Sequence, residues 1–221
     1  MNFVKPETAD ISAFSPLKRI SNEAVRWTDG FWHDRRLAVR DQGVQSLLEA
    51  LDDPENGTYF PNFRHSAEGI GTHCGKEWSD GDCYKVIETM ILIYDTDGGD
   101  DLDAKIDEMI GEIASAQEED GYICTQITMT DKERWTEIHD HELYNFGHLF
   151  TAAVLHHQVT GKTNFLNIAI RAADYLYETF ITHEPALAKF CFNPSQIMGL
   201  VELYRETQDQ KYLELAQPAG L

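Results

Sequence analysis

A ten-residue pattern occurs twice in the sequence, each time directly after an apolar helical run. The stretch "TGKTNFLNIA" at 160–169 aligns with "TQDQKYLELA" at 207–216, and "DTDGGDDLDAKI" at 95–106 is a looser copy. The two close copies begin with threonine and share an aromatic residue, leucine and a later alanine. Such a unit predicts a helix, a tight turn and a second helix that packs back on the first. Because the unit recurs, it predicts an architecture of stacked helical hairpins.

The residues of the repeat indicate how each hairpin closes. Thr160 and Thr207 suit the turn, since a hydroxyl can bond nearby backbone groups there. Phe165 and Tyr212, each followed by leucine, are expected to pack on the preceding helix. One hairpin cannot bury its apolar face alone, and three or four hairpins form an arc with open ends. We therefore expect the chain to be part of a longer protein, truncated at its C-terminus.

Helical periodicity dominates the chain from Phe31 onward. The first 30 residues are polar, and Pro6 and Pro16 break any helix there, so we expect an extended lead-in. Signals for β structure are weak, and "GYICTQITM" at 121–129 is the best strand candidate. The expected fold class is all-α, with little β structure, in one domain from residue 31 to residue 221. Apolar residues recur at helical spacing in 35–51, 82–96, 101–117, 141–160, 163–182, 195–207 and 209–217.

The charge balance excludes some classes of partner. Asp and Glu total 38 against 18 for Lys and Arg, giving a net charge of −20. Such a surface repels nucleic acid and anionic membranes, and it suits a neutral or cationic ligand. The N-terminus lacks the apolar core of a signal peptide, and no run approaches the roughly 18 apolar residues of a membrane span. The four cysteines form no CxxC pair, so we expect reduced thiols and a cytoplasmic location.

The stretch "HDHELYNFGHL" at 139–149 begins like a zinc-protease helix, but its spacing is wrong for a shared metal. That motif places histidines at positions i and i+4, and Asn145 stands four residues after His141. His148 lies roughly 10 Å further along the helix axis, at about 1.5 Å per residue. Two rings that far apart cannot bind one zinc ion. The stretch therefore requires another interpretation.

Four stretches are dense in polar and aromatic residues: 76–88, 116–125, 134–149 and 193–207. At least three lie at or just before the start of a helix. In a ring of hairpins such ends converge on one rim, where aromatic rings can stack on sugars and polar groups can bond hydroxyls. The candidate stacking residues are Trp78, Trp135 and Tyr144, and the candidate hydrogen-bonding residues are Asp80, Asp82, His141, Glu142 and Gln196.

Several of these residues also have a purely structural interpretation. Asp82 and Asp140 each precede an apolar run and are natural N-caps. With Asp140 as the cap, His141 and Glu142 fall in the first helical turn, where Glu142 favours the helix dipole. Trp78 and Trp135 are equally compatible with the core. Gly147 is expected to permit a close helix approach.

The same strings resemble the β-L-arabinofuranosidase family, glycoside hydrolase family 127. The strings are "SDGDCYKVIE", "SAQEEDGYICT", "RWTEIHDHELYNFGHLFTAAVLHHQVTGKTNFLNIAIRAADYL" and "GLVELYRETQDQKYLELA", in the family's order and spacing. The resemblance covers roughly residues 27 to 217 and implies an (α/α)6 toroid, of which this chain is an incomplete part, followed by β-sandwich domains. It also implies exo-acting glycosidases that remove arabinofuranose, with a zinc-bound cysteine nucleophile and a glutamate acid/base.

The resemblance places those reacting groups downstream of this chain. None of Cys74, Cys83, Cys124 or Cys191 matches a zinc-ligand position, so we assign no catalytic residue and no metal ligand here. Zinc is implied for a full-length member only, and the chain alone is expected to be inactive.

Sugar-subsite residues can be carried over from the family. His141 matches the histidine of "HELY", and Asp80 with Asp82 match the acidic pair before "YK..E". Gln196 stands where the family pattern predicts histidine, which replaces an ionisable ring by a neutral amide.

Three other functions remain open from the sequence. The chain can be a non-catalytic carbohydrate-binding module or pseudoenzyme, because the downstream chemistry is absent. It can also be another helical-toroid sugar enzyme, such as an unsaturated-uronide hydrolase or an epimerase. An incomplete toroid also exposes apolar hairpin faces, which suit a scaffold that self-associates.

Overall fold

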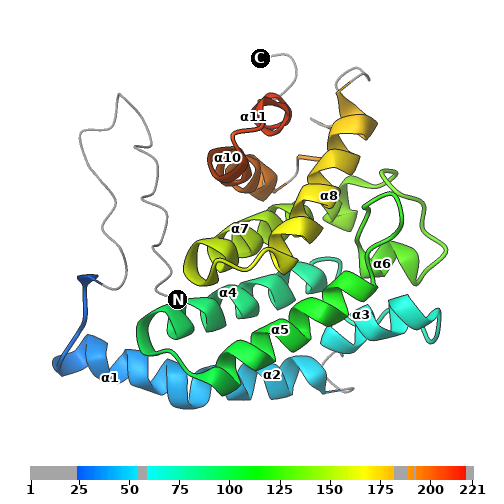
Figure 1. Cartoon of the computed structure of the whole chain (residues 1–221). Coiled ribbons are helices and arrows are strands. Elements are labelled where there is room, and N and C mark those ends of the chain that lie inside the picture. The colour runs from blue at the N-terminus through cyan, green and yellow to red at the C-terminus, as the bar shows by residue number, and fades with distance from the viewer. Residues whose placement is uncertain (1–23, 54–58, 182–188, 192, 218–221) are drawn as a thin grey trace.

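The computed structural model describes residues 24–53, 59–181, 189–191 and 193–217, and within these ranges all regular structure is helical. The helices follow one another as stacked layers in Figure 1. Their bounds are α1 Gly30–Ala38, the π-helix η2 Val39–Gly43, α2 Val44–Asp52, α3 Tyr59–Glu68, α4 Ser79–Asp97, α5 Asp100–Ser115, α6 Thr125–Thr128, the 3-10 helix η3 Ile138–Asp140, α7 Glu142–Thr160, α8 Asn164–Phe180, α10 Ser195–Thr207 and α11 Gln210–Ala216. The all-α fold class is confirmed.

Three hairpins form the body of the molecule, and they are the three that the repeat predicts. Helix α4 turns into α5, α7 into α8, and α10 into α11, each through a connection of two or three residues. Helix α7 packs against both α4 and α10, so it lies at the centre of the stack (Figure 1). The predicted helical segments agree with these helices to within three residues at each boundary, apart from the first segment. There, α1, η2 and α2 form one continuous helical run that begins at Gly30.

The two close copies of the repeat make the same turn. In the first, the Thr160 hydroxyl donates to the His156 carbonyl at 2.7 Å and accepts the Lys162 N–H at 3.1 Å. In the second, the Thr207 hydroxyl donates to the Leu203 carbonyl at 2.8 Å and accepts the N–H two residues on at 3.3 Å. Each hydroxyl thus bonds a carbonyl of the last helical turn on one side and a backbone N–H of the connection on the other. The predicted role of the two threonines is confirmed.

Small residues let α7 approach its neighbours closely. A Cβ added to Gly147 would lie 2.4 Å from the backbone of Ser195 and Gln196, and one added to Gly199 would lie 2.6 Å from the Gly147 carbonyl oxygen. The crossing of α7 and α10 therefore has backbone packed on backbone. The predicted role of Gly147 is confirmed, and this contact fixes where α10 begins relative to α7.

Helix α3 was not predicted, because Pro61 and Asn62 gave the segment the composition of a turn. Pro61 is the third residue of α3, where an N–H has no helical partner and proline is tolerated. Asn62 is fully buried, and its amide bonds both backbone groups of Cys74, at 2.7 and 3.2 Å. These bonds hold the segment between α3 and α4 against α3.

The strand expected at 121–129 is wrong. Residues 121–124 form an irregular segment, and Thr125–Thr128 form the single turn α6. The side chain of Asp80, from α4, accepts the Thr125 N–H at 2.7 Å and the Thr125 hydroxyl at 2.6 Å. This carboxylate accepts the backbone N–H at the start of α6 and so stabilises the helical turn. Among the described residues, no strand lies beside this segment to pair with it.

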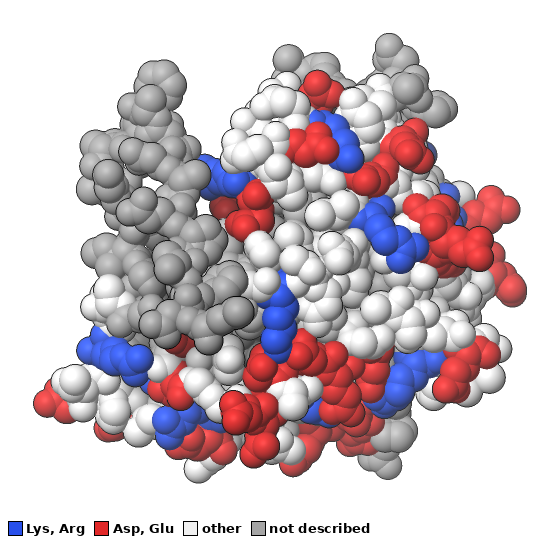
Figure 2. Space-filling model, in the orientation of Figure 1, with Lys and Arg blue, Asp and Glu red and all other residues white. Residues whose placement is uncertain are grey.

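The described surface is acidic and unevenly so. Figure 2 shows acidic side chains gathered over α5 and α2. The first turn of α5 alone carries Asp100, Asp101 and Asp103. Among the described residues, no helix is both long enough and apolar enough to cross a membrane. Most of the expected lead-in, residues 1–23, lies outside the described residues.

Candidate functional site

The N-terminal ends of α4, α7 and α10 meet at one edge of the stack. Asn145, in the first turn of α7, accepts the Gly81 N–H at 3.0 Å and donates to the Glu77 carbonyl at 2.9 Å. The Ser195 hydroxyl, at the start of α10, donates to the Tyr144 carbonyl at 2.9 Å. The predicted convergence of the helix starts is therefore present, and α7 provides the contacts that join the other two.

A chain of rings lies along this edge. The Trp78 and His141 ring centroids are 5.3 Å apart, and those of His141 and Tyr144 are 5.8 Å apart. The His148 ring follows, with its centroid 4.5 Å from that of Tyr144. Trp78 is 38% exposed, so this row of rings reaches the solvent. Trp78 is far in the sequence from the other three rings, and the packing of α4 against α7 brings them together.

Lys85 adds a positive charge and was not among the predicted site residues. Its ammonium group donates to the Asp82 carboxylate at 2.9 Å and to the Tyr144 hydroxyl, and it lies 4.9 Å from the centre of the Tyr144 ring. The only signal in the sequence was its place three residues after Asp82, one turn along the helix. Together these side chains form the rim cluster: Trp78, Asp82, Lys85, His141, Tyr144 and His148.

His148 is a neutral member of the rim cluster. Burial lowers its pKa to about 4, and the nearby Lys85 ammonium acts in the same direction. Its imidazole is therefore uncharged at neutral pH and offers one donor and one acceptor nitrogen. Such a group can bond a hydroxyl without selecting for charge.

The two expected N-caps are wrong. Helix α4 begins at Ser79, so Asp82 lies inside its first turn and pairs with Lys85. Helix α7 begins at Glu142 and His141 occupies the N-cap position, with a left-handed φ of 56°. Asp140 lies before it in η3, where it is buried and paired with Lys132. The left-handed turn at His141, uncommon for a side-chain-bearing residue, orients that ring relative to Trp78.

Asp80 lies beneath the rim cluster. It is 2% exposed, and both carboxylate oxygens accept hydrogen bonds from Thr125. Burial raises the pKa of Asp80 to about 6, although the two Thr125 hydrogen bonds act in the opposite direction. Its role in the described structure is to join α4 to α6.

Glu142 is also buried and internally bonded. One carboxylate oxygen accepts a hydrogen bond from the Tyr122 hydroxyl, and the other accepts one from the backbone N–H of Trp135 at 2.8 Å. Burial raises the pKa of Glu142 to about 7, against the effect of these two bonds. The carboxylate thereby holds the segment before α7 against the segment before α6.

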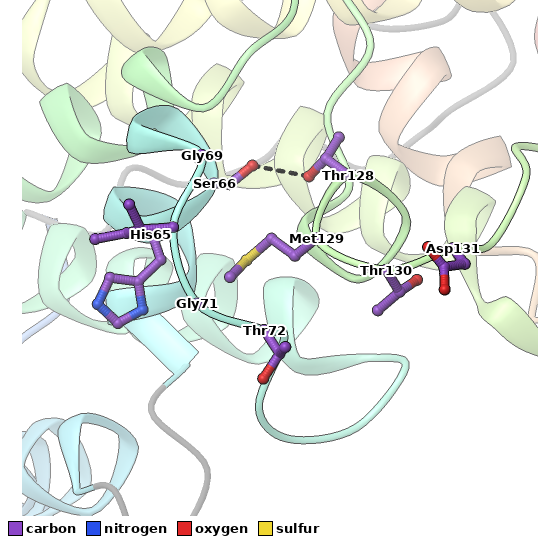
Figure 3. A pocket seen from close by; sticks show the side chains of 10 residues that line it. His65, Ser66, Gly69, Gly71, Thr72, Thr128, Met129, Thr130 and Asp131 are labelled. Carbon is purple, nitrogen blue, oxygen red and sulfur yellow. Dashed lines mark hydrogen bonds between the residues drawn. The ribbon is translucent and has the colours of Figure 1, made fainter.

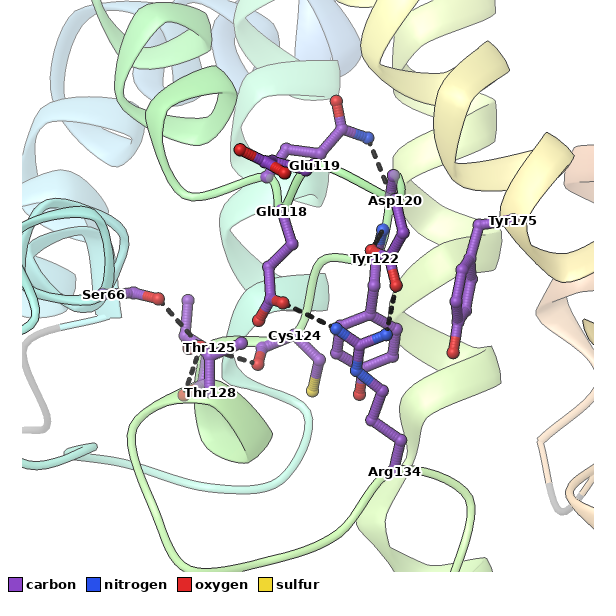
Figure 4. Close-up of polar contacts among 12 residues, drawn as sticks. Ser66, Glu118, Glu119, Asp120, Tyr122, Cys124, Thr125, Thr128, Arg134 and Tyr175 are labelled. Carbon is purple, nitrogen blue, oxygen red and sulfur yellow. Dashed lines mark hydrogen bonds and ion pairs between the residues drawn. The ribbon is translucent and has the colours of Figure 1, made fainter.

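Trp135 lies in an aromatic cluster rather than along the row of exposed rings. Its indole N–H donates to the Tyr175 hydroxyl at 2.8 Å, and the Phe180 ring centroid lies 4.8 Å from its own. The preceding residue, Arg134, pairs with Glu118 and Asp120 at 2.6 Å each, and its guanidinium lies over the Tyr122 ring (Figure 4). These contacts fix the start of the segment that leads to His141.

Gln196 is buried at the start of α10. Its amide nitrogen lies 2.9 Å from the Cys191 sulfur, to which it donates. Its amide oxygen has no hydrogen-bond partner among the described residues. A buried polar atom without a partner is costly.

The described residues do not fit a zinc site. Burial raises the pKa of the Cys83 and Cys124 thiols well above its ordinary value, and the Asp80 carboxylate raises both further. A cysteine binds zinc as a thiolate, which this environment disfavours. In the described ranges, no three side chains of His, Cys, Asp or Glu gather in a way that could hold a metal ion.

Three stacked helical hairpins whose helix starts meet at one polar and aromatic rim form part of a helical toroid. The family model described as "Beta-L-arabinofuranosidase, GH127 catalytic domain" matches residues 24–218. The chain belongs to glycoside hydrolase family 127, as the sequence strings indicated.

Known proteins of this family are similar in sequence and in fold. A non-reducing end beta-L-arabinofuranosidase of Bifidobacterium longum is 30% identical over 222 residues, covering 87% of this chain and 33% of that protein. The crystal structure of a GH127 beta-L-arabinofuranosidase from Geobacillus stearothermophilus has a TM-score of 0.77 at 30% identity, covering 87% of this chain and 32% of the other. A second solved GH127 beta-arabinofuranosidase has a TM-score of 0.77 at 31% identity, covering 90% and 33%. This chain spans about a third of the length of these relatives.

Proposed function

We propose that the rim cluster binds a neutral furanose sugar of the L-arabinofuranose type. The observation that carries the proposal is the row of rings from Trp78 through His141 to Tyr144, beside the hydrogen-bonding groups of Asp82 and Lys85. Rings of this kind stack on the apolar faces of sugars, and the polar groups bond hydroxyls. The relative from Bifidobacterium longum is a beta-L-arabinofuranosidase, and that activity supplies the sugar class.

Of the other four candidate residues, three act on the same site from beneath. Asp80, Glu142 and Trp135 hold the segments that carry the rim cluster, through the bonds described above. Gln196 is the exception, because its unpartnered amide oxygen suits a ligand hydroxyl. The left-handed backbone at both Trp135 and His141 supports this division, since strained residues cluster at binding sites where their surroundings hold them.

A titration with methyl L-arabinofuranoside, followed by tryptophan fluorescence, tests the binding proposal. We expect saturable quenching or enhancement from Trp78. His141→Ala should weaken binding about tenfold, since one hydrogen bond and one ring contact are lost. His157→Ala serves as the control, because His157 lies at the opposite end of α7. Unchanged binding by His141→Ala, or the absence of any response to the sugar, would contradict the proposal.

We expect no hydrolysis by the chain alone. Glycoside hydrolysis ordinarily requires two carboxyl groups about 5 Å apart for retention of configuration. Asp80 and Glu142 are bonded internally, and Asp82 pairs with Lys85. The measurement is release of p-nitrophenol from p-nitrophenyl L-arabinofuranoside by the 221-residue chain. Turnover that Asp80→Asn abolishes would overturn this expectation.

The same proposal covers partners and location. A carbohydrate is the expected ligand, while the acidic surface disfavours nucleic acid and anionic membranes. Cys74, Cys83 and Cys124 are free thiols, which supports a reducing compartment such as the cytoplasm. Exposed apolar side chains on α10, Ile197 and Met198, offer a face for self-association. The family matches favour this reading over an unsaturated-uronide hydrolase or an epimerase.

A further inference from the structure

A hollow of about 460 Å³ lies beside the segments that lead to the rim cluster, and it belongs to the site already described. The Ser66 and Thr128 hydroxyls line it and bond each other at 2.8 Å (Figure 3). The segments that border it, after α3 and after α6, run on to Trp78 and His141. A separate group of polar side chains lies near the C-terminal end of α7, away from the rim cluster.

His156 is a buried histidine near this end of α7. It is 0% exposed, and neither ring nitrogen has a hydrogen-bond partner among the described residues. The Phe165 ring, from α8, lies against it, with the two ring centroids 6.1 Å apart. A neutral imidazole carries one donor and one acceptor nitrogen, and both are costly to bury without partners. An apolar side chain of similar size would fill this space without that cost.

Charged side chains hold the connection between α7 and α8 beside this ring. The Lys162 ammonium, in the connection, donates to the carboxylates of Asp103 and Asp107, on α5, at 2.6 Å each. The Asn164 amide, at the start of α8, donates to Asp107 at 2.9 Å. Through these bonds the α7–α8 hairpin is tied to the α4–α5 hairpin.

His157 ties the same connection to α10. Its Nδ1 lies 2.9 Å from the Lys162 carbonyl oxygen, and its Nε2 lies 3.4 Å from a carboxylate oxygen of Glu206. The three hairpins are thus linked at the end of α7 that is opposite the rim cluster. We call this group the base cluster, and its members are Asp103, Asp107, His156, His157, Lys162 and Glu206.

A proton on His156 would place a further cation in the base cluster. The charged and titratable groups that act on the ring are Asp103 and Asp107 of α5, Lys162 of the connection and His157 of α7. Both carboxylates are already held by the Lys162 ammonium. The buried imidazolium must therefore take a carboxylate from Lys162 or move toward water, since a buried charge without a partner is strongly unfavourable. Either movement loosens the connection from α5.

We propose that the base cluster is an acid-sensitive switch, in which protonation of His156 releases the α7–α8 connection from α5. The switch does not depend on the proposed sugar site, which lies at the other end of α7. It adds a conformational response to acid that is built into the packing of the three hairpins.

The direction of the response follows from the burial of the ring. Burial lowers the pKa of His156 to about 4, and Lys162 acts in the same direction against the two aspartates. An unfolded histidine titrates near about 6.5. The contribution of the neutral ring to stability is therefore complete above about pH 6.5 and is lost as the pH falls toward about 4. Although burial acts the other way, the bonds from Lys162 and Asn164 lower the pKa of Asp107, so its pairing outlasts this range.

Hydrogen exchange of the full 221-residue chain at pH 7 and pH 5, corrected for the intrinsic effect of pH on exchange, tests the proposal. The reporters are the Gly161 and Asn167 amides, which donate to the His157 and Thr163 carbonyls. We expect them to open about twentyfold more often at pH 5 than at pH 7. His156→Leu should abolish this rise, because it removes the titrating ring and breaks no side-chain hydrogen bond with a described residue.

The neighbouring histidine provides the matched control. His157→Gln keeps a donor for the Lys162 carbonyl and should keep the full rise. The Asn145 amide, at the rim end of α7, should respond to pH alike in the parent chain and in His156→Leu. His156→Met, with a side chain that adapts to irregular space, must repeat the result of His156→Leu. A parent chain without the rise, or a rise that survives both apolar substitutions, would overturn the proposal.

Discussion

Gly147→Ala is expected to lower the free energy of unfolding by about 3 kcal/mol, as overpacking of a tight contact does. The added Cβ would lie 2.4 Å from the backbone of Ser195 and Gln196. Backbone cannot rotate away as a flexible side chain can, so α10 must shift away from α7. The shift would also break the bond between the Ser195 hydroxyl and the Tyr144 carbonyl. Urea unfolding followed by circular dichroism measures the change.

A second glycine provides the matched control for this substitution. Gly111 lies inside α5, and a Cβ added there meets no atom within 4 Å. Gly111→Ala should therefore raise the free energy of unfolding by about 0.5–1 kcal/mol, through better helix propensity. Equal effects of the two substitutions would show that the close crossing of α7 and α10 is absent in solution.

Glu142→Gln is expected to be more stable than the parent chain at pH 8 and equally stable near pH 4. Burial raises the pKa of Glu142 to about 7 in the folded chain, whereas an unfolded glutamate titrates near about 4.3. An acid whose pKa is higher in the folded chain than in the unfolded chain makes its full contribution to the free energy of unfolding at a pH below the unfolded pKa. That contribution is lost as the pH rises through about 7, and its size is about 4 kcal/mol.

The amide keeps both hydrogen bonds of the carboxylate. Its oxygen can accept the Trp135 N–H, and its nitrogen can donate to the Tyr122 hydroxyl oxygen. The measurement is urea unfolding of both chains from pH 4 to pH 8, with Glu133→Gln, an exposed site in the same segment, as the control. A constant difference between parent and Glu142→Gln across this range would contradict the buried, internally bonded carboxylate.

Other buried groups titrate in the same range, but they cancel in this comparison. Burial lowers the pKa of His148 and of His156 to about 4, so their contribution is lost as the pH falls from about 6.5. Burial raises the pKa of Asp80 to about 6, which acts in the same direction as Glu142. All three groups are present in both chains, so the difference between the chains isolates Glu142.

The helical hairpins were predictable because their signals are local. Each repeat contains its own turn residue and its own apolar face, so Thr160 and Thr207 identify the hairpins without any tertiary information. Helix α3 was missed for a local reason as well: Pro61 is unfavourable in the middle of a helix but is tolerated in its first turn.

The candidate site was only partly predictable, because its geometry depends on contacts that are distant in sequence. The bond between Asp80 and Thr125 joins residues 45 positions apart, and it turned a candidate sugar contact into a link between helices. The start of α7 moved by one residue, which made His141 the N-cap and left Asp140 to pair with Lys132. No local pattern carries these pairings.

The central claim is that the starts of α4 and α7 form a sugar site in this chain. The most direct test records the histidine ring nitrogens of the ¹⁵N-labelled chain by NMR while methyl L-arabinofuranoside is added. The account predicts shifts for His141 and His148, and none for His156, which is fully buried near the opposite end of α7. Unmoved signals of His141 and His148 at saturating sugar, or equal shifts of all three rings, would contradict it.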